Sequence, residues 1–164
     1  LQHATYGDPI NVVAEALKRL PQHGVVVREQ SPWYASKPVP ISDQPDYING
    51  VALVEYDGDP GGLLAALHAV EASLGRARSV PNAARIIDLD LLAFDDQIIG
   101  GAGQAGLQLP HPRLHERRFV LQPLCDIAPT WRHPILQDMA EILLQRLPPQ
   151  DEGATVRISV SNDE

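Results

Sequence analysis

Two aspartates lie two residues apart in an apolar stretch, and this spacing constrains the fold and the chemistry of the chain more than any other feature. The stretch reads Arg85-Ile-Ile-Asp88-Leu-Asp90-Leu-Leu, and its apolar residues predict a buried β-strand. Side chains two apart leave the same face of a strand, so the carboxylates should lie side by side. Buried carboxylates repel each other and lose hydration, and a cation between them relieves both costs. The pair therefore predicts a Mg²⁺ site, because Mg²⁺ takes oxygen ligands and completes its shell with water and phosphate. The alternative is one exposed aspartate and one capping aspartate at a strand end.

Arginines are concentrated on both sides of this pair. Residues 76–132 hold seven arginines and six acidic residues, although the whole chain carries a net charge of −8. A guanidinium group binds phosphate oxygens through two parallel hydrogen bonds. Carboxylates and arginines together indicate a site for phosphoryl transfer from a nucleotide. Ordinary surface salt bridging is the alternative, and it explains single arginines better than their concentration.

Composition limits the class of protein. A chain of 164 residues is long enough for one domain with a substantial core. Its acidic balance argues against a nucleic acid or an anionic membrane as partner. The single cysteine, Cys125, cannot form an internal disulfide and is interpreted as core filler. No apolar run reaches the length of a membrane span and no signal peptide opens the chain, so the cytoplasm is the expected location. A monomer is expected as well.

The periodicity of apolar residues predicts an α+β protein. Helical spacing recurs at 9–20, 63–74, 116–125 and 136–147, with Asp8 and Pro9 as an expected helix start. Strands are expected from Gly24 toward Tyr34, over 47–56 and over 154–161. The order favours an α+β sandwich over a doubly wound sheet. The glycine-rich run 100–106 lacks the Gly-Lys-Ser/Thr ending of a phosphate loop, and the histidines and the cysteine form no zinc pattern.

Three segments resemble signature motifs of one enzyme family. Besides the aspartate motif, the chain contains Leu109-Pro-His-Pro-Arg-Leu-His-Glu-Arg-Arg-Phe-Val-Leu-Gln-Pro-Leu and Ser42-Asp-Gln-Pro-Asp-Tyr-Ile-Asn. The three motifs, in their order along the chain, resemble those of the 6-hydroxymethyl-7,8-dihydropterin pyrophosphokinases of folate biosynthesis. The resemblance implies transfer of pyrophosphate from ATP to the pterin hydroxymethyl group, with two Mg²⁺ ions. It also implies a ferredoxin-like α+β sandwich with a mostly antiparallel sheet over residues 1–150, followed by a C-terminal tail at 151–164.

The resemblance assigns a role to each matching residue. It gives Asp88 and Asp90 to Mg²⁺, Arg76 and Arg85 to catalysis, Glu71, Arg78, His111 and Arg117 to ATP, and Ser36, Val39, Tyr47, Asn49 and Phe119 to the pterin. The residues themselves fit these roles, because a flat pterin needs aromatic faces for stacking and an amide to read its edge. Core packing is the alternative for the two aromatic residues. The general base is left unassigned.

The chain departs from the family pattern in two places. The loop 80–85 is about one residue shorter than the family's and lacks its tryptophan and first arginine. Family members begin with an apolar strand followed by a leucine that Leu1 matches, so we expect that strand to be missing here. The tail Ala154-Thr-Val-Arg-Ile-Ser-Val-Ser-Asn alternates like a strand, and one hypothesis is that it fills the vacant central position, as in a circular permutation. A disordered tail is the alternative.

Two other functions follow from these departures and from the site residues. A non-catalytic module that binds a nucleotide and a pterin would explain the altered loop and the missing strand. A Mg²⁺-dependent phosphohydrolase is a further possibility, because paired carboxylates and arginines also suit hydrolysis. The identity of the products separates all three functions.

Overall fold

The protein is represented by a computed structural model that describes residues 7–38, 43, 45–75, 87–100, 106–150 and 154–159. In chain order its elements are α1 (Pro9–Arg19), η1 (Leu20–His23), β1 (Val26–Gln30), β2 (Tyr34–Ser36), β3 (Tyr47–Asn49), β4 (Ala52–Glu55), α2 (Pro60–Ser73), η3 (Leu114–Glu116), α3 (Arg118–Ile127), α4 (Ala140–Gln145) and β5 (Val156–Arg157). All pairings between these strands are antiparallel. The α+β class predicted from the sequence is therefore confirmed.

Helices α1 and α2 start where their sequences carry capping signals. Asp8 precedes Pro9, the first residue of α1, and Asp59 precedes Pro60, the first residue of α2. The Asp59 carboxylate accepts a hydrogen bond from the Gly62 N–H at 2.7 Å, which satisfies one donor that the first helical turn leaves free. The two helices and the strands β1 and β4 enclose the first core, which contains Val12, Ala16, Leu20, Val25, Leu63, Ala66, Leu67, Val70, Leu74 and Ile87.

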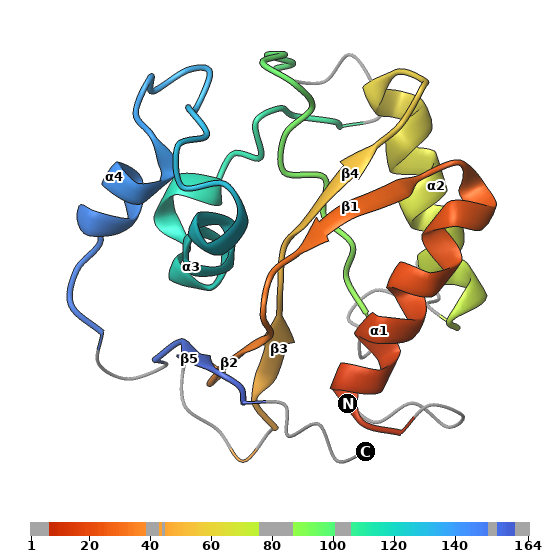
Figure 1. Ribbon diagram of the computed structural model, residues 1–164, viewed down its shortest axis with the longest axis horizontal. Helices are drawn as coiled ribbons and strands as arrows, with labels where there is room; N and C mark the ends of the chain where they lie inside the picture. The colour runs from red at the N-terminus through yellow and green to blue at the C-terminus, as the bar shows by residue number, and fades with distance from the viewer. Residues whose placement is uncertain are drawn as a thin grey trace.

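The strands β1 to β4 form one long hairpin that bends at its middle (Figure 1). β1 pairs with β4, and β2 pairs with β3. Ser31 bridges the bend: its N–H donates to the Val51 carbonyl, and its hydroxyl accepts from the Val51 N–H, both at 2.9 Å. A Cβ at Gly50 would lie 2.6 Å from the Trp33 ring, so only glycine lets the chain pass this ring.

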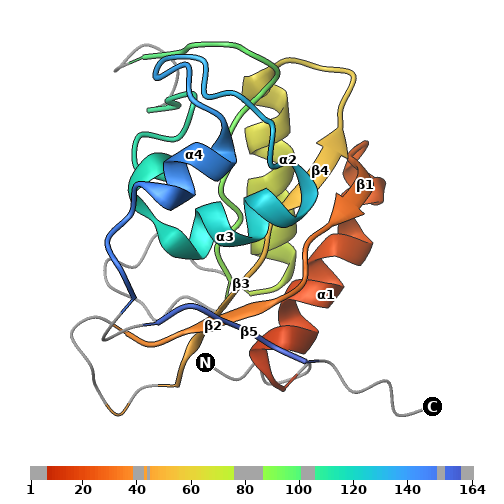
Figure 2. The same ribbon diagram turned by 60° about the vertical axis from the view of Figure 1, so that its left-hand side comes forward.

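The helices α3 and α4 build the second core with Leu114. Its buried members are Leu114, Leu121, Leu124, Ala140 and Leu143. Figure 1 shows the α1–α2 pair on one side of the hairpin and the α3–α4 pair on the other, and Figure 2 shows β2, β3 and β5 running below α3. Cys125 is half-buried against this core, as expected of a packing residue.

Helix α4 is shorter than the sequence pattern predicted. Residues 134–136 form a turn, and Gln137 has a φ of +64°, a left-handed conformation that a helix cannot include. The Arg132 guanidinium donates to the Gln137 carbonyl and stabilises this turn. The helix therefore begins only at Ala140.

The C-terminal tail corrects a prediction. β5 pairs with β2 at the outer edge of a sheet of order β3-β2-β5, with Val156 opposite Ala35 and Arg157 opposite Tyr34. The tail therefore does not lie beside the aspartate segment, and the hypothesis that it fills a central vacancy there is wrong for residues 154–159. A fully disordered tail is equally wrong for these residues. The two-residue strand leaves Val156 59% exposed, as an edge position allows.

The helices were compared with the requirements of a membrane span. Within the described ranges, none of the helices combines the length and the apolar character that a transmembrane span requires.

Candidate active site

The aspartate segment crosses the molecule between its two cores. Ile87, Leu89 and Leu91 pack on the first core, and Leu92 packs on the second. Between these apolar residues, Asp88 and Asp90 are exposed. The alternation sends both carboxylates to the solvent side, as a strand periodicity of two requires.

The expectation of a buried β-strand at this segment is wrong. Residues 87–93 have no strand assignment, and neither described sheet includes them. Because both aspartates are exposed, water screens their repulsion and they lose little hydration. A bound cation is therefore not needed to keep the segment folded.

Glu71 supports the backbone between the two aspartates. It belongs to α2 and is completely buried, and its Oε2 accepts a hydrogen bond from the Leu89 N–H at 3.4 Å. The family resemblance assigns Glu71 to ATP, whereas its burial favours a positioning role. A sequence signal for this burial exists: Glu71 lies four residues after Leu67 and eight after Leu63, on the apolar face of the helix.

His111 is fixed next to the aspartate segment. Its N–H donates to the Leu92 carbonyl at 2.8 Å. Burial lowers the pKa of its imidazole, nearby Asp90 raises it, and Arg117 and Arg113 lower it further, so the ring is neutral at pH 7. Its Nδ1 accepts from the Arg113 N–H at 3.2 Å, which puts the remaining proton on Nε2. His111 can therefore donate one hydrogen bond to an anionic ligand beside Asp90.

Arg117 connects this polar region to an aromatic one. It is the N-cap residue of α3, and its guanidinium carbon lies 5.5 Å from the centre of the Phe119 ring, a cation–π distance. Arg118 and Arg132 are held elsewhere: Arg118 donates to the Pro148 carbonyl at 2.7 Å, and Arg132 to the Gln137 carbonyl. Of the described arginines expected around the aspartates, Arg113 and Arg117 lie close enough to His111 to act on its pKa.

The predicted pterin residues of the hairpin share one face of the sheet. In the β2–β3 register Ser36 lies opposite Tyr47, and Tyr34 lies opposite Asn49. Directly opposed residues and residues two apart point to the same side, so all four side chains lie on one face. Helix α3, which carries Phe119, packs against β2 and β3. Ser36 is buried, Asn49 is half-buried, and Tyr47 is 55% exposed.

Four predicted site residues lie outside the described residues. These are Val39, Arg76, Arg78 and Arg85. Sequence reasoning in turn overlooked Tyr34, whose hydroxyl donates to the Asp126 carboxylate of α3. No sequence pattern links two residues that are 92 positions apart.

The arrangement defines a class of protein. Of the exposed paired carboxylates, Asp90 lies near the neutral histidine donor, Arg117 lies over Phe119 at the start of α3, and α3 packs against the strand that carries Asn49. These groups suit an enzyme that binds a phosphorylated nucleotide next to a flat heterocycle and transfers a phosphoryl-type group.

Comparison with known proteins identifies the family. Residues 4–129 match the family described as 7,8-dihydro-6-hydroxymethylpterin-pyrophosphokinase. The chain is 36% identical over 148 residues to the 2-amino-4-hydroxy-6-hydroxymethyldihydropteridine pyrophosphokinase of Pseudomonas aeruginosa, covering 86% of this chain and 88% of the relative. It is 36% identical to the enzyme of the same name from Haemophilus influenzae, covering 84% of each chain. The folic acid synthesis protein fol1 of Schizosaccharomyces pombe is 34% identical over 88% of this chain, which spans 19% of that protein.

The chain therefore belongs to the 7,8-dihydro-6-hydroxymethylpterin-pyrophosphokinase family. It is a transferase of the pyrophosphokinase class that acts in folate biosynthesis. The resemblance drawn from its three motifs is confirmed, and a purely non-catalytic module is not favoured.

Proposed function

We propose that this protein transfers a pyrophosphoryl group from ATP to the hydroxymethyl group of 6-hydroxymethyl-7,8-dihydropterin. In this step the hydroxymethyl oxygen attacks the β-phosphorus of ATP. A new C–O–P linkage forms, the bond between the β-phosphorus and the oxygen of the α-phosphate breaks, AMP leaves, and the hydroxyl proton passes to solvent or a base. The observation that carries the proposal is the exposed Asp88–Asp90 pair beside His111. Phe119 lies in the first turn of α3, which follows His111 in the chain.

Asp88 and Asp90 are the proposed ligands of Mg²⁺, with two ions expected. Their carboxylates are hard oxygen donors on one exposed side of an extended segment. Within the described part of the chain no three acidic, histidine or cysteine side chains gather into a metal cage. A site of this kind suits Mg²⁺, which takes only one or two carboxylates and completes its shell with water and phosphate oxygens. When bound, Mg²⁺ neutralises phosphate charge and orients the reacting groups.

The chain's own residues divide the remaining tasks. His111 donates from Nε2 to a phosphate oxygen, and Arg117 supplies a fixed positive charge at the start of α3. Glu71 holds the Leu89 backbone, so that both aspartates keep their places. Arg76 and Arg85 are proposed to stabilise charge that develops on the transferring group, and Arg78 to bind ATP. Their support is the family match, which covers residues 4–129.

The pterin is proposed to lie between the β2–β3 face and the start of α3. Asn49 offers both a donor and an acceptor to the pterin edge, while Tyr47 and Phe119 offer ring faces. Ser36 and Val39 are proposed to contribute backbone hydrogen bonds. The common face of Ser36, Tyr47 and Asn49, with α3 packed against it, supports this placement.

The finer features of the fold and setting are part of the same proposal. A ferredoxin-like arrangement is supported by the antiparallel strands and the helix pairs that pack against them. An acidic, single-cysteine chain is compatible with a cytoplasmic monomer.

A product assay tests the proposal. The protein is incubated with Mg²⁺, ATP and the reduced pterin, and nucleotides are separated by chromatography. AMP and pterin diphosphate are expected in equal amounts, and AMP should form only when the pterin is present. ADP as the nucleotide product would refute pyrophosphoryl transfer, whereas binding of both ligands without AMP would favour the non-catalytic module.

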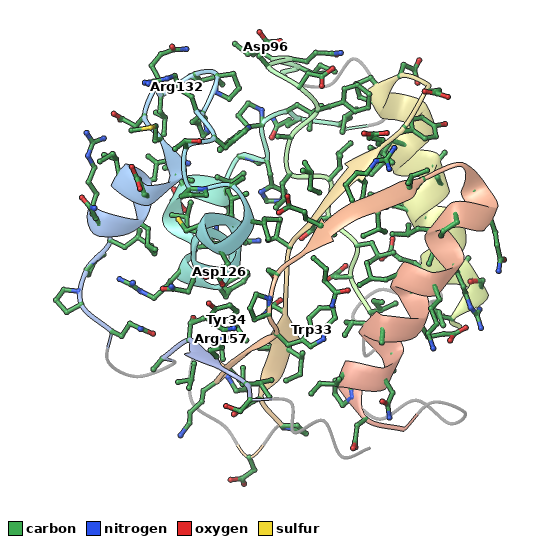
Figure 3. The ribbon with its side chains drawn as sticks, viewed as in Figure 1. Trp33, Tyr34, Asp96, Asp126, Arg132 and Arg157 are labelled. Carbon is green, nitrogen blue, oxygen red and sulfur yellow. The ribbon has the colours of Figure 1, made fainter. Side chains whose placement is uncertain are left out.

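Two matched variants locate the reaction. Asp88→Asn removes one proposed metal ligand, and Asp96→Asn makes the same change at an exposed turn residue outside the site (Figure 3). We expect AMP formation to be lost in Asp88→Asn and unchanged in Asp96→Asn. Full activity in Asp88→Asn would remove the aspartate pair from the mechanism.

A further inference from the structure

A buried tyrosine ties β2 to the end of helix α3. Tyr34 is 4% exposed, and its hydroxyl donates to the carboxylate of Asp126. In Figure 3 the two side chains meet below α3, next to Arg157 of β5. The bond joins two elements that lie far apart in the sequence, and none of the roles assigned above uses it.

The tyrosine lies in the row of residues that faces the proposed pterin. In the strand register Tyr34 is directly opposite Asn49 on one side and Arg157 on the other. All three therefore point to the same face of the β3-β2-β5 sheet. The hydroxyl of Tyr34 is thus fixed on the strand pair that carries the amide proposed to read the pterin edge.

The partner on α3 shares a helix face with the proposed stacking ring. Phe119 and Asp126 are seven residues apart, almost two full helical turns, so their side chains leave α3 within about 20° of each other. Gln122 lies between them on the same face and is close enough to lower the pKa of the Tyr34 hydroxyl. The tyrosine bond therefore fixes the face of α3 that presents Phe119 to the sheet.

The environment of the tyrosine keeps it a hydrogen-bond donor. Burial, followed by the hydrogen bond to Asp126 and the charge of this carboxylate, raises the pKa of Tyr34 to about 12, against the lowering effects of Arg157 and Gln122. Between the two elements there is thus a charge-assisted hydrogen bond, which is stronger than a neutral one.

We infer that Tyr34 and Asp126 are a positioning pair that sets the spacing between Phe119 on α3 and Asn49 on β3, and thereby the affinity for the pterin. The inference rests on the proposed function, because it assumes that these two residues bind the pterin. Neither Tyr34 nor Asp126 needs to touch the ligand. Loss of the bond should let α3 shift on the sheet and weaken pterin binding, whereas the ATP side, built on residues 87–92 and His111, should be unaffected.

Steady-state kinetics of four variants test the inference. Tyr34→Phe removes the hydroxyl alone, and Asp126→Ala removes its acceptor; each should raise the KM for the pterin roughly tenfold, the effect expected of one lost charge-assisted hydrogen bond. The KM for ATP should stay within about twofold. Asp126→Asn keeps an acceptor oxygen and should restore most of the pterin affinity. The double variant Tyr34→Phe/Asp126→Ala should be no worse than either single variant, because both remove the same bond.

Tyr56→Phe is the matched control, since Tyr56 packs on the first core, away from α3. It should leave both KM values unchanged. A purely structural role for Tyr34 would lower the amount of folded enzyme, and with it the maximal rate, without raising the KM for the pterin selectively. An unchanged pterin KM in Tyr34→Phe, or an equal rise in both KM values, would overturn the inference.

Direct binding separates this inference from the proposed function. The pterin is titrated by fluorescence into wild type and Tyr34→Phe in the presence of Mg²⁺ and a non-hydrolysable ATP analogue. If wild type binds pterin but forms no AMP, the proposed function fails, and a roughly tenfold weaker Kd in Tyr34→Phe still supports the positioning pair. Equal Kd values in the two proteins, or no pterin binding by wild type, would refute it.

Discussion

Glu71→Ala tests whether a buried carboxylate holds the aspartate segment in place. Glu71 is completely buried, and it accepts the Leu89 N–H at 3.4 Å. Alanine has no acceptor, so this part-buried N–H would lose its partner. Leaving a buried donor unsatisfied costs about 1–3 kcal/mol, and we expect the free energy of unfolding to fall by about this amount.

The same substitution should also lower kcat, and by more than the loss of folded protein would explain. Leu89 lies between the two aspartates, so a shift of its backbone displaces both carboxylates. A displacement of about 1 Å can lower a rate roughly 100-fold. We therefore expect kcat for AMP formation to fall by about two orders of magnitude in Glu71→Ala, at temperatures where urea titration shows the variant to be folded. Glu71→Gln keeps an acceptor oxygen and should stay within about tenfold of wild type.

The comparison of these two variants can refute the reasoning. If Glu71 bound ATP directly through its charge, Glu71→Gln would weaken ATP binding as much as Glu71→Ala while keeping wild-type stability. That result would reject the positioning role. Glu141→Ala is the control, because Glu141 lies in α4, outside the site, and it should change neither ATP affinity nor turnover.

Three further predictions concern stability. Asp88→Ala and Asp90→Ala should each change the free energy of unfolding by less than about 0.5 kcal/mol, since both side chains are exposed; urea titration showing a large loss would mean that the pair holds the fold. Burial and then His115 lower the pKa of the His133 imidazole. The contribution of neutral His133 to stability is therefore fully present above pH 6.5 and is lost as the pH falls through its pKa in the folded protein. The urea midpoint should drop on acidification, and it should drop less in His133→Asn. Leu121→Ala should cost about 2–5 kcal/mol, because Leu121 is fully buried in the second core, whereas Leu136→Ala, at a side chain that is 42% exposed, should cost less than about 1 kcal/mol; equal thermal shifts in these two variants would contradict the assigned core.

The sequence predicted those structural features that depend only on neighbouring residues, such as helix starts and side-chain alternation. The starts of α1 and α2 follow from an aspartate before a proline, and the common side of Asp88 and Asp90 follows from strict alternation with apolar residues. The alternation was correct, but the expected burial of the strand was not. Alternation fixes which side chains share a side of the chain, whereas burial depends on what packs against that side.

Features created by tertiary packing could not be predicted from the sequence. The late start of α4 depends on the left-handed conformation of Gln137, which no local pattern specifies. The edge position of β5 depends on the pairing that β2 offers. The bond between Tyr34 and Asp126 exists only after α3 has packed on the hairpin. The roles of Glu71 and Tyr34 therefore follow from the folded structure alone.

The path of the aspartate segment between the two cores has a consequence for how the enzyme loses activity. Leu89 and Leu91 pack on the α1–α2 side, and Leu92 packs on the α3–α4 side. Local opening of either half would release the segment, so the population of competent enzyme is limited by whichever half opens more often. Hydrogen exchange at the Leu89 amide should therefore follow the less stable of the two halves, and heat should inactivate the enzyme before the more stable half has unfolded.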